Sequence, residues 1–397
     1  MAENTQQDPF GQLPEELRIK IIKLSPHPFS LRNLAHASPA MGRVLDRYPL
    51  EIVEEVMEAT VTSKIRRIMG AVLKARFSVF PASLSEAQTV AETDSTMATE
   101  EIRSSGLNRA AKAVRSLLAN AANVHDWSHA CLEHLIRKSM ELRPSTLIKN
   151  GSGYTRRDEF ENAESHKKDY VPQCTGPLSW AEELRMMLSF WQLQFFLELQ
   201  GAGNNGSLDT DWSREDVDVL SQSSADGFYD VSNCVREQIL TASDFLGAVT
   251  SGTIASVEAV NHKAYSLPTI PCVEEAASKC RCTEAFEEER INSYRNWAPG
   301  HGSIESQGLW GYSFYSAMSS LDGWLDGYRL TLCYPFQCWR QYGFAIWDDK
   351  RMVDLGMKHP THKSFMRASF DYSFRWWSLL TEEELRQEFS LREQGLR

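Results

Sequence analysis

The sequence predicts an all-α fold, with an N-terminal module of three to four short helices over residues 8–59 and a larger, irregular helical region over 60–397. Three observations predict it. Apolar residues recur at helical spacing in the first sixty residues. Proline and Ser-Pro steps punctuate them where helices begin. A long apolar run near residue 180 opens with a Ser-x-x-Glu capping pattern. The chain has 397 residues, enough to bury a core without disulfides or a metal.

The first helix is predicted from Leu13 to Leu24. Pro14 suits a first helical turn, and the acidic pair Glu15 and Glu16 favours the positive helix N-terminus. Four apolar residues share one face at i, i+4, i+8 and i+11: Leu13, Leu17, Ile21 and Leu24. The turn signal at 25–28, with two prolines, ends this helix.

Three further short helices are predicted in the module. The second covers about 29–37, with Leu31 and Leu34 on one side, and the third starts at the Ser38-Pro39 cap. Pro49 leads into a fourth helix over 51–59. So small a unit cannot bury all of its leucines within itself, so we expect a surplus apolar face for a partner helix.

The rest of the chain is predicted to be helical with two interruptions. Further helices are expected over 61–79, 99–120, 126–143, 179–199 and 381–397. Residues 81–99, rich in Ser, Thr, Ala and Glu, predict a loop. The polar stretch 144–177 predicts a flexible connection.

Tryptophans gather in the last hundred residues, where seven of the eleven lie between Trp297 and Trp377. So many rings predict ordered packing, because an exposed cluster would favour aggregation. A pocket for a ligand or peptide is the alternative.

The opening residues resemble a known family. Leu13-Pro14-x-Glu16-Leu17-x-x-x-Ile21-x-x-Leu24, followed by Leu31-x-x-Leu34 and Ala37-Ser38, is similar to an F-box. The variant Ala-Ser-Pro-Ala-Met after the second helix resembles F-box proteins of filamentous fungi. Their later segments resemble the stretch from Leu178 to Phe196 and the Gly-Phe-x-x-Trp-Asp-Asp motif at 343–349. The F-box match covers about an eighth of the chain.

The resemblance implies an interaction protein without chemistry of its own. It implies a substrate-recognition subunit of an SCF-type cullin–RING ubiquitin ligase, in which other subunits catalyse the transfer of ubiquitin. The implied adaptor-binding residues, which would dock the Skp-type adaptor, are Leu13, Pro14, Leu17, Ile21, Leu24, Leu31 and Leu34. The region 60–397 would bind a protein client that the sequence does not name. A scaffold that works outside any ligase is a second possibility.

A metal-dependent hydrolase is the enzyme alternative, and it rests on His125 and His129. These histidines stand at i, i+4, a spacing that places two imidazoles on one helix face and can bind zinc. Asp126 stands where the usual motif has Glu, and no third ligand is marked by spacing. The ordinary interpretation is two histidines at an exposed or capping helix start.

Two other groups of chemically active residues favour ordinary roles. Cys272, Cys280 and Cys282, with His262 upstream, lack the C-x2-C pairs of structural zinc sites, so buried thiols are expected. The pair at 348–349, two aspartates, is typical of a cap or turn. We therefore expect no catalytic metal and no cofactor.

Composition bears on partners and location. The formal net charge of −11 argues against a broad phosphate-binding surface, so we expect no nucleic-acid partner. The longest apolar stretches fall short of the ~20 residues that a membrane span needs, so we expect no membrane partner. The polar start lacks the basic and apolar regions of a secretory signal, and the eight cysteines are dispersed. These features predict a soluble intracellular protein, cytoplasmic or nuclear.

Overall fold

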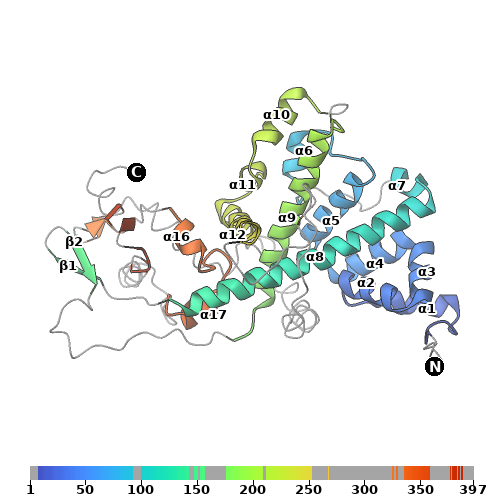
Figure 1. Cartoon of the computed structure of the whole chain (residues 1–397), viewed down its shortest axis with the longest axis horizontal. Helices are drawn as coiled ribbons and strands as arrows, with labels where there is room; N and C mark the ends of the chain where they lie inside the picture. The colour runs from blue at the N-terminus through green and yellow to red at the C-terminus, as the bar shows by residue number, and fades with distance from the viewer. Residues whose placement is uncertain are drawn as a thin grey trace. The chain divides into compact units, whose positions relative to one another are not determined.

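The computed structural model confirms the all-α prediction (Figure 1). The residues that it describes are 8–92, 100–142, 147–150, 153–156, 176–208, 212–252, 267, 324–325, 328–329, 335–357, 376, 378–381, 383–384 and 386–387. Among them, strands form only two small antiparallel hairpins. One pairs β1 (Leu147–Asn150) with β2 (Gly153–Arg156), and the other pairs β3 (Trp324–Leu325) with β4 (Tyr328–Arg329).

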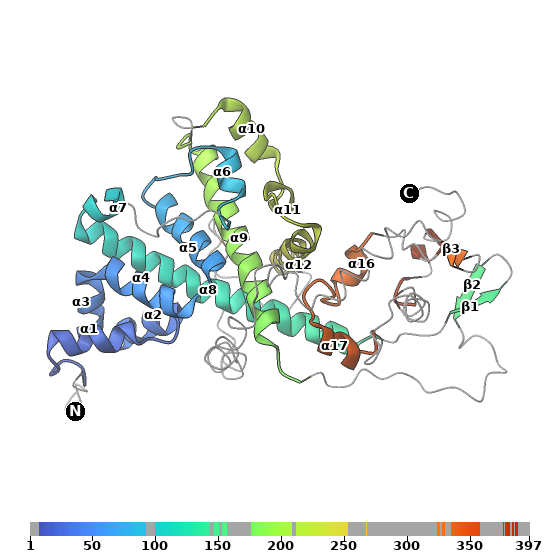
Figure 2. The same cartoon turned by 180° about the vertical axis from the view of Figure 1, so that it is seen from behind.

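The N-terminal module consists of four short helices, as predicted. They are α1 (Glu15–Lys23), α2 (Pro28–Ala37), α3 (Pro39–Arg47) and α4 (Pro49–Thr60). Each begins at a proline or directly after one, where the missing N–H is tolerated and φ is already helical. Figures 1 and 2 both show these helices gathered together. Their shared core is apolar and includes Ile22, Leu31, Met41, Leu45, Ile52 and Val56.

The chain forms two compact units. The first comprises Met1–Ala130, Met186–Ser232 and Ala242–Asn296, and the second comprises Cys131–Arg185, Asn233–Thr241 and Trp297–Arg397. The other helices that the structure describes in the larger region are α5 (Ser63–Ala75), α6 (Leu84–Gln88), α7 (Glu100–Ser104), α8 (Leu107–Met140), α9 (Trp180–Asn204), α10 (Arg214–Gln222), α11 (Ala225–Phe228), α12 (Asn233–Thr250), α16 (Gln337–Arg340) and α17 (Asp349–Asp354). The long helices α8, α9 and α12 contribute residues to both units.

Two predicted features of the larger region were wrong. Residues 99–120 and 126–143 do not form two helices, because α8 continues through the expected gap. Residues 121–125 read Ala-Ala-Asn-Val-His and contain neither Gly nor Pro, so nothing there stops a helix. The predicted loop at 81–99 contains α6, which Ser83 caps by accepting from the Glu86 amide.

The predicted connection at 144–177 lies mostly outside the described residues. Within that range the structure describes the β1–β2 hairpin and residues 176–177. The cap predicted directly after it is present: Ser179 N–H donates to Glu182 Oε2 at 2.9 Å, and Glu182 N–H donates to Ser179 Oγ at 3.3 Å. This reciprocal pair starts α9 as the sequence predicted.

Aromatic residues fill the core of each unit. In the first unit, the ring of Trp127 on α8 lies 5.9 Å from that of Phe190 on α9 and 5.9 Å from that of Phe245 on α12. In the second, Trp339 and Trp376 are fully buried, and Trp339 Nε1 donates to the Trp376 carbonyl at 3.0 Å. The C-terminal tryptophans Trp339 and Trp376 are thus core, as predicted for their cluster.

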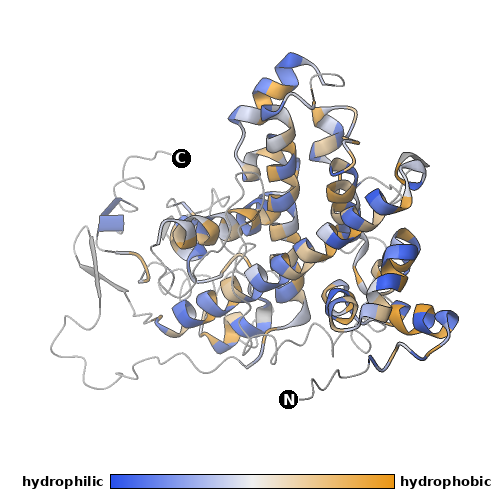
Figure 3. Cartoon of the chain, turned by 45° about the vertical axis from the view of Figure 1, so that its right-hand side comes forward, coloured by the Kyte–Doolittle hydropathy of each residue, from blue (hydrophilic) through white to orange (hydrophobic). Residues whose placement is uncertain are grey.

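Many of the described helices are amphipathic. Figure 3 shows polar and apolar residues in bands along them, the pattern expected when a helix buries one side. The helix α9 differs, because residues 184–196 are buried on nearly every side. Among the described residues, no helix combines the length and the apolar character that crossing a bilayer requires.

Candidate functional site

The predicted stripe of α1 lies on the outside of the module. Leu24 is 80% exposed and Leu17 is 46% exposed, whereas Ile22 on the other side of the helix is fully buried. Pro14 is also exposed, and three further residues are half-buried: Leu13, Ile21 and Leu34. We call the five residues in and beside α1, which are Leu13, Pro14, Leu17, Ile21 and Leu24, the α1 face, whereas Leu34 lies on α2. One apolar side of α1 thus packs in the core of the module, and a second apolar side is exposed to solvent.

Leu31, the seventh residue predicted to bind an adaptor, is not part of this surface. Its side chain is fully buried on α2. Its spacing to Leu34 predicted that both residues lie on the same side of the helix. In the structure Leu31 is buried, whereas Leu34 is only half-buried. Leu31 therefore stabilises the module from within and offers no contact to a partner.

Charged pairs hold α1 against its neighbours. Lys23 lies 2.7 Å from Glu51 and 2.6 Å from Glu55 on α4. Arg47 at the end of α3 lies 3.0 Å from Glu15. These pairs lie at the two ends of α1 and each includes a side chain more than half exposed, so they add little to the burial of Ile22 and leave the leucines outward.

The N-terminal segment caps α3. Asp8 accepts from the Ser38 hydroxyl at 2.9 Å and from the Ala40 amide at 2.9 Å. The Ala40 hydrogen bond is the largest cause of the lowered pKa of the Asp8 carboxyl. Ser38 in turn accepts from the Met41 amide at 3.1 Å, which is the N-cap predicted for this helix.

The module is joined to α8 by a forked ion pair. Arg115 Nε lies 2.6 Å from Asp46 Oδ1, and its Nη2 lies 3.0 Å from Oδ2. The same Nη2 donates to the Gly42 carbonyl at 3.2 Å. A Cβ on Gly42 would fall 2.9 Å from the Ala35 carbonyl oxygen, so glycine is needed where α2 and α3 approach. The module that bears the α1 face is therefore connected to the rest of the first unit through contacts between α3 and α8.

The histidine pair lies in the interior of α8, so the predicted exposed or capping helix start was wrong. His125 and His129 are both buried, with ring centroids 4.3 Å apart. The ring of Phe29 on α2 lies 4.5 Å from that of His125. Burial, with a smaller effect of His125, lowers the pKa of His129 from 6.5 to about 3, so it is neutral at pH 7.

Nothing among the described residues completes a metal site around these histidines. No group of three or more His, Cys, Asp or Glu side chains there could hold an ion. The other predicted set, His262 with Cys272, Cys280 and Cys282, lies outside the described residues.

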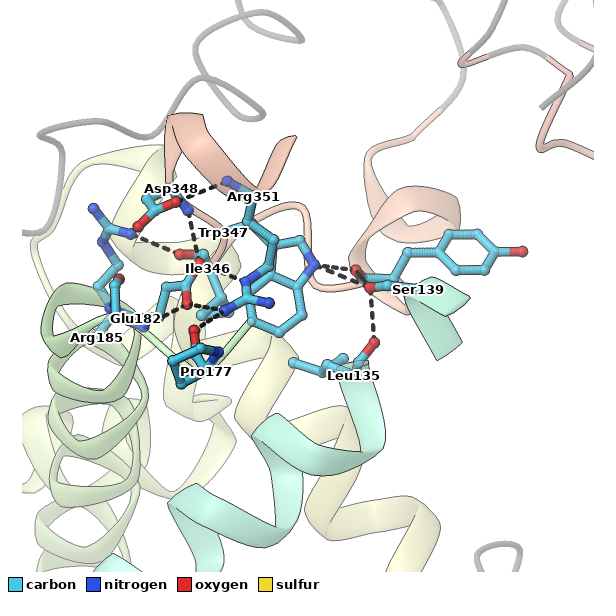
Figure 4. Close-up of polar contacts among 11 residues, drawn as sticks. Leu135, Ser139, Pro177, Glu182, Arg185, Ile346, Trp347, Asp348 and Arg351 are labelled. Carbon is cyan, nitrogen blue, oxygen red and sulfur yellow. Dashed lines mark hydrogen bonds and ion pairs between the residues drawn. The ribbon is translucent and has the colours of Figure 1, made fainter. Parts of the chain in front are cut away.

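Two distant segments that carried the wider resemblance meet in the second unit (Figure 4). Arg351 on α17 makes two 2.8 Å hydrogen bonds to the two oxygens of Glu182 on α9. Arg185, one turn along α9, donates to the Ile346 carbonyl at 2.7 Å. The Glu182 carboxylate also accepts from the Asp348 amide at 3.2 Å. The Gly-Phe-x-x-Trp-Asp-Asp motif is thus bound to the first turns of α9.

Trp347 of the same motif is held from α8. Its Nε1 donates to Ser139 Oγ at 3.2 Å and to the Tyr342 carbonyl at 2.6 Å. The Arg351 guanidinium lies over its ring at 4.9 Å. Asp348 caps α17 by accepting from the Arg351 amide at 3.0 Å, as the cap prediction required. The polar groups of this cluster are hydrogen-bonded to one another, so we interpret the cluster as a structural core.

Sequence reasoning missed this cluster as a unit. The capping box identified Glu182 only as a local cap, and its pairing with Arg351, 169 positions further along the chain, has no local signal. One signal could have suggested the pairing. Glu182 is a charged residue in an apolar helix, and Arg351 is a charged residue of opposite sign just after the aromatic motif.

The chain matches no protein-family model, no curated protein and no solved structure.

Proposed function

We propose that this chain is a substrate-recognition subunit that docks an Skp-type adaptor of an SCF ubiquitin ligase through the α1 face. The observation that carries the proposal is the outward stripe of α1, with Leu17 and Leu24 exposed while Ile22 fills the core. A short module has no internal use for that stripe, and the F-box resemblance of the same residues names a partner for it.

The chemistry of the α1 face suits a helical protein partner. Exposed leucines at i, i+7 on one helix provide the apolar centre that an adaptor helix could cover. The neighbouring Glu16 and Lys20 are exposed and would form a polar rim of mixed charge. Such an arrangement favours a specific contact over nonspecific adhesion.

The remaining parts of the proposal follow from that docking. The chain would carry no catalytic residues, since transfer of ubiquitin would belong to other subunits of the ligase. The region after residue 60 would bind the protein client, and the Asp46–Arg115 pair would help to transmit a fixed orientation from the α1 face to α8. Work within such a ligase would place the protein in the cytoplasm or nucleus.

Mixing the purified full chain with a purified Skp-type adaptor tests the proposal. Size-exclusion chromatography at micromolar concentrations should give one complex of both proteins. Separate elution of the two proteins at these concentrations would contradict adaptor docking. If a variant without the exposed leucines of the α1 face still co-elutes with the adaptor, the two proteins bind each other through another surface.

A further inference from the structure

Arg18 borders the α1 face. Residues three and four positions apart are neighbours on a helix, so Arg18 lies beside both Pro14 and Ile21 of that face. Ile22, which is buried in the core of the module, is its neighbour on the other side. The arginine therefore stands at the boundary between the exposed apolar stripe of α1 and the core.

The Arg18 guanidinium has no partner in the part of the chain that the structure describes. The side chain is half-buried, and its Nε is closed to solvent without a hydrogen-bond acceptor. The two terminal nitrogens also lack an acceptor or a counter-ion there, but they are open to solvent. A half-buried charged group with an unsatisfied donor is unfavourable unless a partner is supplied.

The other charged residues of α1 are either paired or exposed. Glu15 and Lys23 form ion pairs with α3 and α4. Glu16 and Lys20 are exposed, so water can solvate them. Among the described residues, Arg18 is thus the one charged side chain of this helix that is half-buried and unpaired.

We propose that Arg18 is the charged anchor of the α1 face and binds a carboxylate of the adaptor. The inference rests on the adaptor docking proposed above and assigns the chemistry of the facing surface. That surface would carry an aspartate or glutamate beside the apolar patch that covers Leu17 and Leu24. The two terminal nitrogens of the planar guanidinium donate to both carboxylate oxygens, a geometry that lysine does not match. Covering the α1 face removes water from this pair and strengthens it.

The packing of Arg18 suits an anchor. Because the module covers Nε, the side chain is partly ordered before any partner arrives. Less conformational entropy is then lost on binding than for a fully exposed side chain such as Lys20, at the opposite edge of the α1 face. Arginine is also enriched among the residues that contribute most to protein–protein binding.

The test measures the affinity of the full chain for a purified Skp-type adaptor by isothermal titration calorimetry at 50 and 500 mM salt. Arg18→Met keeps an unbranched stem and removes the charge, so its dissociation constant at 50 mM salt should be at least tenfold higher than that of the unaltered chain. Arg18→Lys keeps the charge without the fork and should give an intermediate value. Because salt screens charge pairs, the difference between Arg18→Met and the unaltered chain should shrink at 500 mM salt.

Two controls accompany these variants. Arg214→Met removes an exposed arginine of α10 and should bind as the unaltered chain does. Thermal melts establish that each variant folds, and Arg18→Gln replaces Arg18→Met if the latter unfolds.

A double-mutant cycle identifies the facing group. The surface carboxylates of the adaptor are changed one at a time to amides. One such change should weaken binding to the unaltered chain at least tenfold and have little further effect on binding to Arg18→Met. A loss of affinity in Arg18→Met that no adaptor carboxylate matches would contradict the anchor.

The outcomes separate this inference from adaptor docking itself. If the unaltered chain binds the adaptor and Arg18→Met binds equally well at both salt concentrations, Arg18 is not the anchor, although docking stands. If the unaltered chain does not bind the adaptor, docking and the anchor are both wrong.

Discussion

Glu182 and Arg351 form a buried ion pair with two 2.8 Å hydrogen bonds, although they are 169 positions apart in the chain. The side chain of Glu182 is fully buried and that of Arg351 almost so. Arg351 also donates to the Pro177 carbonyl at 2.9 Å, two residues before the capping box of α9 begins at Ser179. One pair thus joins the beginning of α9 to α17 and fixes the aromatic motif between them.

Breaking this pair from one side should destabilise the second unit strongly. Glu182→Gln leaves the Arg351 charge buried without its counter-ion, and loss of one partner of such a pair typically costs about 3–5 kcal/mol. Thermal melting followed by near-ultraviolet circular dichroism, which reports on the packed tryptophans, measures the loss.

Two comparisons separate burial from charge. Glu141→Gln breaks the exposed Lys138–Glu141 pair and should cost no more than about 0.5 kcal/mol. The double variant Glu182→Leu with Arg351→Met should be more stable than Glu182→Gln alone, because no charge is left buried. Equal melting of Glu182→Gln and Glu141→Gln would show that the buried pair contributes little.

Gly343 should tolerate no side chain. Its φ is +80°, and a Cβ there would fall 2.6 Å from Nε1 of Trp347. Gly343→Ala therefore combines left-handed strain with a collision against a buried ring. Gly106 has a φ of +93° and open space around it, so Gly106→Ala carries the strain alone.

The difference between the two glycine variants isolates the collision. Overpacking a buried site typically costs about 1–3 kcal/mol, and Gly343→Ala should be less stable than Gly106→Ala by that amount. Urea denaturation of both variants measures it. Similar midpoints would mean that Trp347 moves aside at little cost.

His129 should make the fold sensitive to acid. Because burial lowers its pKa to about 3, the unfolded chain, with a pKa near 6.5, takes up the proton first as pH falls. The contribution of neutral, buried His129 to the free energy of unfolding is complete above pH 6.5. It is lost progressively as the pH falls from about 6.5 to 3. At pH 5 the loss is about 2 kcal/mol.

Melting temperatures from pH 7.5 to 5 test this assignment. His129→Leu cannot take up a proton and should flatten the pH dependence of stability, whereas His36→Leu, at an exposed position of α2, should keep it. A His129→Leu variant with the pH dependence of the unaltered chain would place the acid-sensitive group elsewhere.

Local sequence signals predicted the module well. Pro39 was predicted as the first residue of a helix and is so in the structure, whereas the helices predicted from about 29 and 51 begin one and two residues earlier, at Pro28 and Pro49. Caps were equally visible, as at Ser38 and Ser179, because capping depends on residues within one turn.

Features that depend on tertiary packing were not predictable in this way. Spacing placed Leu31 and Leu34 on one side of the second helix and the resemblance implied that both bind an adaptor, but only the packing of α2 shows that Leu31 is buried. The interior position of His125 and the contacts of Leu267 with Asn123 and Gln194 depend on segments far apart in the chain. For the same reason no local signal indicated that α8 contributes to both units.

Affinity for the Skp-type adaptor, compared between two matched double variants, tests the central claim most directly. Leu17→Ala with Leu24→Ala removes the exposed leucines of the α1 face. Leu107→Ala with Val219→Ala removes apolar residues that are 53% and 43% exposed elsewhere. Burying each leucine in a contact contributes about 1.5–3 kcal/mol, so the first variant should bind about 100-fold more weakly or not at all. The second should bind as the unaltered chain does. Equal affinity of the two variants, with both folded, would contradict docking through the α1 face.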